Sequence, residues 1–165
     1  MGEQKVVISL GTNLGDKLKN LNTALGNIES YGSILKKSRI FSSEPWGYNS
    51  ENHFLNMGLL IKTSLDPNQL LRKLKIIEKQ MGRSPKLIKS YQDRIIDLDI
   101  LIYQGVSMVD EDLSIPHLKI KERKFSLLIL KDLFGNKIIP DLNDSADKML
   151  LKCNDKSNVV LIDEK

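Results

Sequence analysis

The chain of 165 residues is poor in cysteine and aromatic residues and has no long apolar run. Its one cysteine, Cys153, has no partner for an intrachain disulfide, so nothing indicates an oxidising compartment and we expect an inert thiol. No apolar segment approaches the roughly 20 residues that a membrane-spanning helix needs. Residues 1–5 lack the pattern of a signal peptide. We therefore expect a cytoplasmic protein with no membrane partner.

The glycine-rich phosphate loops of common nucleotide-binding proteins are also missing. Residues 11–17 place two glycines before a lysine, but their spacing is one residue short of the Walker pattern, and Leu18 follows where Ser or Thr is required. The glycine signatures of protein kinases and of dinucleotide-binding proteins are absent as well. Any bound nucleotide must therefore be held by side chains and metal ions.

The charge of the chain is mild and evenly spread. Its 25 Lys and Arg against 21 Asp and Glu give a net charge of +4, which permits an anionic ligand. The densest basic cluster is typical of the solvated face of an amphipathic helix and predicts no function; it consists of Arg72, Lys73, Lys75 and Lys79. The length fits one domain over residues 1–165, which is long enough to bury a substantial core.

Local signals predict a mixed fold. Strands are expected over residues 5–10, 34–42, 54–63 and 95–103, and a terminal strand over 159–162. Helices are expected over residues 17–30, 67–81 and 119–133, with a small one over 146–152. Asp16 and Asp66 are the expected N-caps, and Pro67 suits a first helical position. The order describes an α+β, ferredoxin-like βαββαβ core, an antiparallel sheet flanked by helices in three α-β-α layers.

Two polar segments of about ten residues, 44–53 and 83–93, interrupt this order. Loops of that length are uncommon in a compact domain and are often functional. The second segment leads directly into the strand expected over residues 95–103. We therefore expect both loops to border a functional site.

Asp97 and Asp99 stand two apart inside that otherwise apolar strand. Side chains alternate between faces along a strand, so the two carboxylates share one face, about 7 Å apart along the chain. The other face is expected to carry Ile96, Leu98, Ile100 and Ile102. Carboxylates so placed suit Mg²⁺, which binds one or two carboxylates together with substrate phosphates, and a pair of ions can clamp a phosphoryl transfer. A solvent-facing strand surface carries acids in the same way, so the pattern alone leaves both interpretations open.

Three arginines and a histidine border the loops and strands near this pair in the expected topology. Arg83, Arg94 and Arg123 have the planar, permanently charged group that binds phosphate oxygens bidentately. A surface salt bridge is the alternative for each of them. His117 could donate a hydrogen bond to a phosphate or make a local bond to the backbone.

Phe54, Asn56 and Phe125 form another kind of group. Strand alternation places Phe54 and Asn56 on one face, and an asparagine that points into an aromatic cavity costs free energy unless a ligand satisfies it. Two aromatic rings and one amide could hold a flat heterocycle. Ordinary core packing, with Asn56 bonded to the backbone, is the alternative.

A series of short motifs occurs in a fixed order between Lys5 and Leu151. They are Gly11-Thr12-Asn13-Leu14-Gly15-Asp16, Ser43-Glu44-Pro45-Trp46-Gly47, Phe54-Leu55-Asn56, Glu78, Gly82-Arg83, Arg94-x-x-Asp97-Leu98-Asp99-Ile100-Leu101, Ile115-Pro116-His117 and Arg123-x-Phe125. Each is weak evidence alone, but in this order they are highly specific. Together they resemble the 6-hydroxymethyl-7,8-dihydropterin pyrophosphokinase family, whose members transfer pyrophosphate from ATP to a pterin alcohol in folate biosynthesis.

The resemblance implies a role for each of these positions. It implies that Asp97 and Asp99 hold two Mg²⁺ ions and that, with Arg83 and Arg94, they are the catalytic residues. The implied pterin contacts are a sandwich between Phe54 and Phe125, pairing with Asn56, and further contacts from Gly11, Ser43, Glu44 and Trp46. The implied contacts with ATP come from Glu78, Arg83, Arg94, Ile100, Ser114, His117 and Arg123.

Four positions depart from the family's usual pattern. Asp93 stands before Arg94 where many relatives have proline, and we expect its carboxylate to weaken the phosphate grip of Arg94 unless it is turned away. Pro85, Tyr91 and Leu118 stand where some relatives have an arginine, a tryptophan and a polar aromatic residue. The resemblance therefore leaves the contribution of the second loop to ATP binding open.

Two other classes of function fit the sequence less well. A ferredoxin-like nucleic-acid-binding module would fit the topology, but its aromatic signature is absent from a chain with 5% aromatic residues. A two-metal phosphodiesterase would need further ligands, and His53 and His117 are the only histidines. On the resemblance, we expect in-line attack of the pterin hydroxyl on the β-phosphorus of MgATP by a monomer with small-molecule substrates and no nucleic-acid partner.

Overall fold

The computed structural model describes residues 2–83 and 91–162. Its helices are α1 (Lys17–Ile28), α2 (Pro67–Gln80), α3 (Lys124–Phe134) and α4 (Ala146–Lys152), with a 3₁₀ turn at Pro140–Leu142. The longer strands are β1 (Gln4–Thr12), β2 (Ser33–Lys37), β3 (Ile40–Ser43), β4 (Phe54–Thr63), β5 (Asp97–Tyr103) and β10 (Val159–Ile162). Two short hairpins are formed by β6 (Met108–Val109) with β7 (Ser114–Ile115), and by β8 (Ile138–Ile139) with β9 (Asp144–Ser145).

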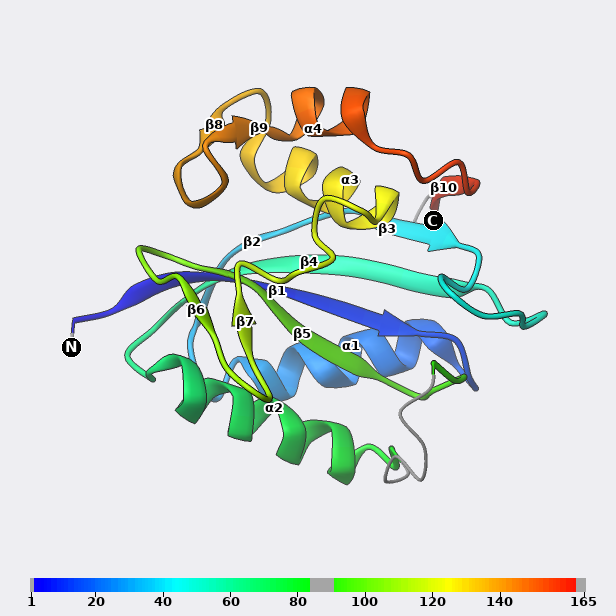
Figure 1. The fold of residues 1–165 in the computed structure, drawn as a ribbon. Coiled ribbons are helices and arrows are strands. Elements are labelled where there is room, and N and C mark those ends of the chain that lie inside the picture. Colours follow the sequence, from blue (N-terminus) through cyan, green and yellow to red (C-terminus); the bar gives the residue numbers. More distant parts are fainter. Residues whose placement is uncertain (1, 84–90, 163–165) are drawn as a thin grey trace.

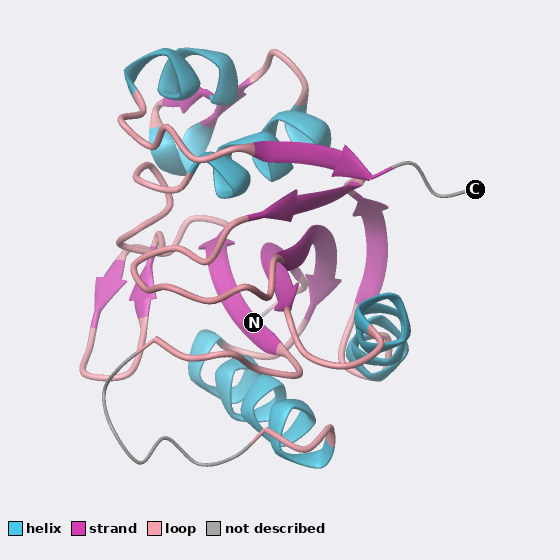
Figure 2. Ribbon diagram, turned by 90° about the vertical axis from the view of Figure 1, so that its right-hand side faces the viewer, coloured by secondary structure: helices cyan, strands magenta, loops and turns pink. Residues whose placement is uncertain are grey.

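One antiparallel sheet lies at the centre of the molecule. Its strand order is β10-β3-β4-β1-β5, and β2 also pairs with β4. Helices α1 and α2 lie on one face of the sheet, and α3 and α4 lie on the other (Figures 1 and 2). The predicted α+β, ferredoxin-like core with three layers is therefore confirmed.

The two helices of the first face begin where the sequence predicts. The Asp16 carboxylate accepts a hydrogen bond from the Lys19 N–H, 3.0 Å away, at the start of α1. Asp66 and Gln69 form a reciprocal capping box at the start of α2, with Pro67 at the first helical position. These caps satisfy N–H groups that have no partner within the helix, so short-range chemistry sets both starting points.

The apolar core forms two layers, one on each face of the sheet. Between the sheet and α1 and α2 it includes Val6, Ile8, Leu10, Leu21, Leu70, Leu74 and Ile77. Between the sheet and α3 and α4 it includes Val7, Phe41, Leu127, Ile129, Leu130 and Met149. Helix α3 lies so close to β4 that a Cβ atom at Gly58 would overlap Cγ2 of Ile129. Glycine at position 58 thus sets the height of α3 above the sheet.

Three predicted element boundaries are wrong. The single strand expected over residues 34–42 is split in two, because Ser38 leaves the ladder and bonds Gly58 through both its N–H and its hydroxyl. The helix expected from residue 119 begins at Lys124, because residues 117–122 form turns closed by bonds such as Ile120 N–H to His117 O. The strand expected from residue 95 begins at Asp97.

The prediction that Ile102 shares a face with Ile100 is also wrong. The pairing of β5 with β1 shifts by one residue, so that Ile8 lies opposite Ile100 whereas Val7 lies opposite Ile102. This bulge turns Ile102 toward the layer of α3 and α4, while Ile100 stays in the layer of α1 and α2. Asp97 and Asp99 precede the bulge, so their shared face is unaffected.

The last predicted elements are confirmed. Helix α4 spans residues 146–152, and β10 pairs with β3 at the edge of the sheet. The layer against α3 and α4 also buries Cys153. Within residues 2–83 and 91–162, no helix combines the length and apolar character that crossing a membrane requires.

Candidate functional site

The candidate site lies on the sheet face that carries α3. In the strand register Asn56 lies opposite Gly11, and Gly11 lies opposite Asp97. Two residues away, Ser9 lies opposite Asp99. Because residues two apart share a face, both carboxylates stand on the same side of the sheet as Asn56. Backbone pairing alone thus aligns an amide, a glycine and two acids across three strands.

A first cavity opens beside this row, between the sheet, the start of α3 and the loop of residues 44–53. All seven residues predicted to contact the pterin line it, namely Gly11, Ser43, Glu44, Trp46, Phe54, Asn56 and Phe125. Asp97 and Asp99 line it too. The structure therefore brings together residues that are up to 114 positions apart in the sequence, from Gly11 to Phe125.

A second cavity lies on the other side of the two aspartates, toward α2 and the β6–β7 hairpin. Six of the seven residues predicted to contact ATP line it: Arg83, Arg94, Ile100, Ser114, His117 and Arg123. Asp97 and Asp99 belong to its lining as well as to that of the first cavity. Ligands in the two cavities would therefore meet at the aspartates.

The side chain of Asn56 is held in one orientation by the protein. Its Nδ2 donates to Phe41 O at 3.1 Å and to Ser43 Oγ at 2.8 Å. Its Oδ1 faces Gly11, where an added Cβ would stand 3.4 Å from it, and accepts no bond from the residues that the structure describes. Bonding to the backbone and facing the cavity are thus both observed, and Oδ1 is free to accept a bond from a ligand.

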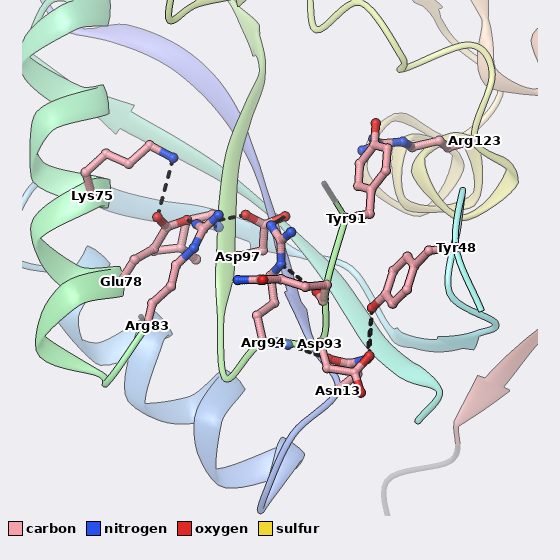
Figure 3. Close-up of polar contacts among 12 residues, drawn as sticks. Asn13, Tyr48, Lys75, Glu78, Arg83, Tyr91, Asp93, Arg94, Asp97 and Arg123 are labelled. Atoms are coloured by element: carbon pink, nitrogen blue, oxygen red, sulfur yellow. Dashed lines mark hydrogen bonds and ion pairs between the residues drawn. The ribbon is translucent and has the colours of Figure 1, made fainter. Parts of the chain in front are cut away.

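Both oxygens of the Asp97 carboxylate lie beside arginines. Arg83 Nη1 is 3.0 Å from Oδ1, and Arg94 Nη1 is 3.0 Å from Oδ2 (Figure 3). Burial would raise the pKa of Asp97, but Arg94 and Arg83 outweigh it and hold the pKa below its ordinary value. Asp97 is therefore kept ionised, as a metal ligand must be.

Asp99 has the opposite electrostatic environment. Burial and the neighbouring Asp97 carboxylate raise the pKa of Asp99. A divalent cation between the two carboxylates would offset both causes. No group of three or more acidic, histidine or cysteine ligands occurs in residues 2–83 and 91–162. Two carboxylates fit Mg²⁺, which takes its remaining ligands from water and phosphate oxygens.

Glu78 lies beneath the site and lines neither cavity. Its side chain is only 3% exposed, its Oε1 accepts the Leu98 N–H at 2.8 Å, and it contacts Arg83. Lys75 Nζ lies 3.4 Å from Oε2 (Figure 3). Burial raises the pKa of Glu78 despite these partners. Glu78 thus connects Arg83 to the edge strand β5, and its predicted proximity to the nucleotide stays a prediction.

His117 is oriented by a local bond. Its Nδ1 accepts the Lys119 N–H at 3.1 Å, so the neutral ring carries its proton on Nε2. Burial lowers the pKa of His117, which favours that neutral form. The ring lines the second cavity. The two interpretations of His117 are therefore compatible, because a bond to the backbone leaves Nε2–H available as a donor.

Aromatic rings and Arg123 form the outer wall of the first cavity. The Tyr48 ring stacks on that of Tyr91, with centroids 6.5 Å apart and an angle of 8° between planes. Trp46 meets Tyr91 edge-on at 6.0 Å, and the Arg123 guanidinium lies 4.7 Å from the centre of the Trp46 ring. Arg123 Nε is buried and has no partner among the described residues. A cationic group is thus held between the two cavities.

The structure accounts for three of the four departures from the family pattern. The Asp93 carboxylate is turned away from the phosphate side and lines neither cavity. Tyr91 belongs to the aromatic wall, and Leu118 is exposed at the mouth of the second cavity. Pro85 lies outside the described residues, as do residues 84–90 of the second predicted loop.

Several lining residues were not predicted from the sequence. Lys75 lines the second cavity, although its position predicted only a solvated helix face. The available signal was its place three residues before Glu78, on the same side of α2. Ser9 lines the first cavity, and strand alternation from Gly11 would have indicated it. Tyr48 carried no such local signal, since its position depends on the path of a long loop.

Comparisons with known proteins agree on one family. Residues 7–135 match the family model described as 7,8-dihydro-6-hydroxymethylpterin-pyrophosphokinase. A 2-amino-4-hydroxy-6-hydroxymethyldihydropteridine pyrophosphokinase of Aquifex aeolicus is 35% identical over 135 residues, which cover 82% of this chain and 83% of that protein. The folic acid synthesis protein FOL1 of Dictyostelium discoideum is 34% identical over 160 residues, 96% of this chain but only 24% of that protein. The chain thus spans about a quarter of this longer relative.

The fold has solved counterparts. The crystal structure of wild-type Plasmodium falciparum HPPK-DHPS matches with a TM-score of 0.73 and 19% identity, over 91% of this chain and 44% of that one. At this identity the likeness concerns the fold alone.

Proposed function

The chain belongs to the 7,8-dihydro-6-hydroxymethylpterin-pyrophosphokinase family, and from this premise we propose that it transfers the pyrophosphoryl group of ATP to the hydroxymethyl group of 6-hydroxymethyl-7,8-dihydropterin. AMP is the second product, and the reaction belongs to folate biosynthesis. The observation that carries the proposal is that two cavities, one aromatic and one rich in arginine, share Asp97 and Asp99.

The first cavity would bind the pterin. Phe54 and Phe125 are the rings between which the flat heterocycle lies, because aromatic faces stack favourably on planar groups. The free Oδ1 of Asn56 accepts a hydrogen bond from a donor on the edge of the ring system. Gly11, Ser43, Glu44 and Trp46 complete the wall, and the absence of a side chain at Gly11 leaves room for the ligand edge.

The second cavity would bind ATP. Arg83, Arg94 and Arg123 bind phosphate oxygens through their charged, planar groups, and Nε2–H of His117 donates one further hydrogen bond. Ile100 and Ser114 border the adenine. Glu78 acts beneath them by supporting Arg83.

Asp97 and Asp99 are the residues that would hold two Mg²⁺ ions. Bound Mg²⁺ would supply Lewis acidity for the pterin hydroxyl and positive charge for the transferred phosphates. The arginines of the second cavity align the triphosphate, while the first cavity orients the hydroxymethyl group, so that the protein contributes chiefly positioning and electrostatics. No side chain is needed as a general base.

The transfer conserves atoms and charge in one displacement. The hydroxymethyl oxygen forms a bond to the β-phosphorus in line with the bond that breaks, which joins the β-phosphorus to the oxygen of the α-phosphate. That oxygen leaves with the bonding electrons as part of AMP, and the hydroxyl proton is released to water. The product carries both terminal phosphates on the pterin.

The proposal extends to the organisation of the protein. It assigns residues 1–165 to one domain that acts as a monomer in the cytoplasm on small-molecule substrates. Size-exclusion chromatography with light scattering would test the monomer directly, since a dimer would double the measured mass.

A coupled assay for AMP tests the reaction. AMP should form with ATP and the pterin alcohol together, require Mg²⁺, and be absent with ATP alone. Replacing Asp97 or Asp99 by asparagine should lower kcat by at least about 10²- to 10³-fold, the loss typical of one preorganised charge stabiliser. Asp132→Asn, which changes a carboxylate on α3 outside both cavities, is the matched control. Near-normal turnover by Asp97→Asn would contradict the assignment.

A further inference from the structure

Asp93 is the acceptor of four side-chain hydrogen bonds, three of them from the loop of residues 44–53. Its Oδ1 accepts from Asn13 Nδ2 at 2.8 Å and from the Tyr48 hydroxyl at 2.9 Å (Figure 3). Its Oδ2 accepts from Ser50 Oγ at 2.9 Å and from Asn52 Nδ2 at 2.7 Å. Each oxygen thus has two donors, which matches the acceptor capacity of an ionised carboxylate.

Through Asn13, the Asp93 carboxylate is also linked to Arg94, which lies just before the strand that carries Asp97 and Asp99. Asn13 Oδ1 accepts the Arg94 N–H at 2.8 Å, and the Asn13 N–H donates to Arg94 O at 3.1 Å. Asn13 Nδ2 also reaches Asn52 O at 3.1 Å. The segment of residues 93–94, the end of β1 and the loop are therefore joined in one network of bonds.

The network ends at the wall of the first cavity. The hydroxyl of Tyr48 bonds to Asp93, while its ring stacks on Tyr91, which in turn contacts Trp46. All three rings line the first cavity, whereas Asp93 lines neither cavity. Asp93 can therefore affect a ligand in the first cavity only through its bonded partners, and three of these four partners belong to the loop.

We propose that Asp93 is a positioning residue for the pterin, because its carboxylate holds the loop of residues 44–53 in the arrangement that places Trp46 and Tyr48 on the wall of the first cavity. This inference rests on the proposed function, since it takes the pterin as the occupant of that cavity. Asp93 does not touch the substrate. Its role is to lower the cost of ordering the loop when the substrate binds.

The electrostatics of the network agree with this role. Burial works against ionisation of Asp93, but the bonds from Asn52, Ser50, Asn13 and Tyr48 outweigh it and lower the pKa of the carboxyl. Burial and the bond to Asp93 raise the pKa of Tyr48 to about 12. The carboxylate therefore remains charged and the phenol remains a donor at neutral pH.

The sharpest test is Asp93→Asn, which keeps the shape of the side chain. An amide replaces one acceptor oxygen by an NH₂ group, which then faces two donors instead of accepting from them. The same substitution at Asp132 is the matched control, because that carboxylate also accepts several bonds, all from Arg39, but lies outside both cavities.

Two readouts separate positioning from folding. In the unliganded protein, hydrogen exchange of residues 44–53 should become faster in Asp93→Asn and stay unchanged in Asp132→Asn. In the coupled assay, KM for the pterin alcohol should rise about tenfold in Asp93→Asn, as expected when bonds to a charged group are lost. KM for ATP should change by less than about twofold, because the loop lines the pterin cavity.

A second variant tests the proposal even if Asp93→Asn folds poorly. Tyr48→Phe keeps the stacked ring and removes one donor, so it should raise KM for the pterin by a smaller factor. Combined with Asp93→Asn it should add less than its own single effect, because both act on the same bond.

The proposal is overturned if the loop loosens in Asp93→Asn while KM for the pterin stays at the wild-type value, or if Asp132→Asn gives the same changes. A wild-type protein that releases no AMP with the pterin would instead remove the proposed function and the pterin role with it. The exchange data would still report whether Asp93 holds the loop, so the two failures are distinguishable.

Discussion

Nη1 of Arg83 lies 3.0 Å from Oδ1 of Asp97, the carboxylate proposed to bind metal. Arg94 occupies the other oxygen of the same group at 3.0 Å. In this arrangement the two arginines neutralise the negative charge of Asp97, which would otherwise attract a cation. Under the proposed function, the approach of phosphate groups would give both arginines other anionic partners, so that metal and nucleotide would bind together.

Magnesium alone should therefore bind weakly. Two carboxylates, one of them paired with arginines, provide few ligands, whereas a triphosphate adds oxygens and draws the arginines away. We expect Mg²⁺ to bind at least about tenfold more tightly in the presence of a nonhydrolysable ATP analogue, a difference of about 1.4 kcal/mol. Titration calorimetry with and without the analogue measures this. Equal affinity in both titrations would show that the arginines do not compete with the metal.

Removal of Arg83 should destabilise the protein as well as lower its activity. The Arg83 side chain is 11% exposed and contacts Glu78, which is 3% exposed. Removing one partner of a buried ion pair leaves the other charge uncompensated and lowers the free energy of unfolding by about 3–5 kcal/mol. Because Lys75 and the Leu98 N–H remain beside Glu78, we expect Arg83→Ala to lie near the lower limit. Urea denaturation gives the free energy of unfolding.

Adding Glu78→Gln to Arg83→Ala should restore part of that stability. The amide keeps an oxygen for the Leu98 N–H but carries no charge that needs a partner. A double variant no more stable than Arg83→Ala would mean that the buried charge of Glu78 is not the cause of the loss.

The starting points of the first helices could be predicted because their signals are local. Asp16 and Asp66 bond N–H groups only three residues away. The start of α3 could not be predicted in the same way, since its N-cap residue, Arg123, makes no side-chain capping bond to mark it. The bulge that turns Ile102 depends on the register between β1 and β5, which no local pattern encodes.

The same distinction between local and long-range signals applies to the candidate site. The shared face of Asp97 and Asp99 follows from strand alternation, and the place of Asn56 follows from the same rule. The partners of Asp93 could not be predicted from strand alternation. All four lie more than 40 positions away, and three of them belong to a loop without periodicity. The sequence predicted that Asp93 acts on the neighbouring Arg94, which is expected to bind phosphate, whereas the hydrogen-bond partners of its carboxylate are four uncharged side chains.

The stability of the protein should depend on pH through Asp132. Bonds from the side chain and backbone of Arg39 hold the pKa of Asp132 below its ordinary value. A depressed folded-state pKa adds stability that is fully present above the unfolded-state pKa of about 3.9 and is lost as the pH falls through the folded-state pKa. Asp132→Asn should therefore cost up to about 1 kcal/mol at pH 7, a modest value because Arg39 is largely exposed.

The difference between wild type and Asp132→Asn should begin to shrink below about pH 4 and disappear once the pH is below the depressed folded-state pKa, where Asp132 is uncharged in the folded and the unfolded protein. Thermal unfolding at several pH values between about 2.5 and 7, a range that includes the ordinary aspartate pKa, would measure this difference in stability. A difference that grows as the pH falls would contradict the assigned sign.

A methyl group at Gly11 should block the pterin without disturbing the fold. An added Cβ would stand 3.4 Å from Asn56 Oδ1 and 3.6 Å from Phe54 Cδ1, which are ordinary contact distances, and Gly11 has no left-handed backbone conformation to strain. The methyl group would nevertheless occupy the space in which a ligand reaches Oδ1. We expect Gly11→Ala to raise KM for the pterin alcohol at least about tenfold, as when a bond to a buried polar group is lost.

The free energy of unfolding and a matched control variant show whether Gly11→Ala blocks the pterin site or misfolds the protein. The free energy of unfolding of Gly11→Ala should stay within about 1 kcal/mol of wild type. Gly26→Ala on the exposed side of α1 has no atom within 4 Å of its new Cβ, so it should gain about 1 kcal/mol of helix propensity and leave KM unchanged. If Gly11→Ala kept the wild-type KM, the Oδ1 of Asn56 would not be where the pterin is recognised, because any group bonding that atom must pass within reach of the new methyl.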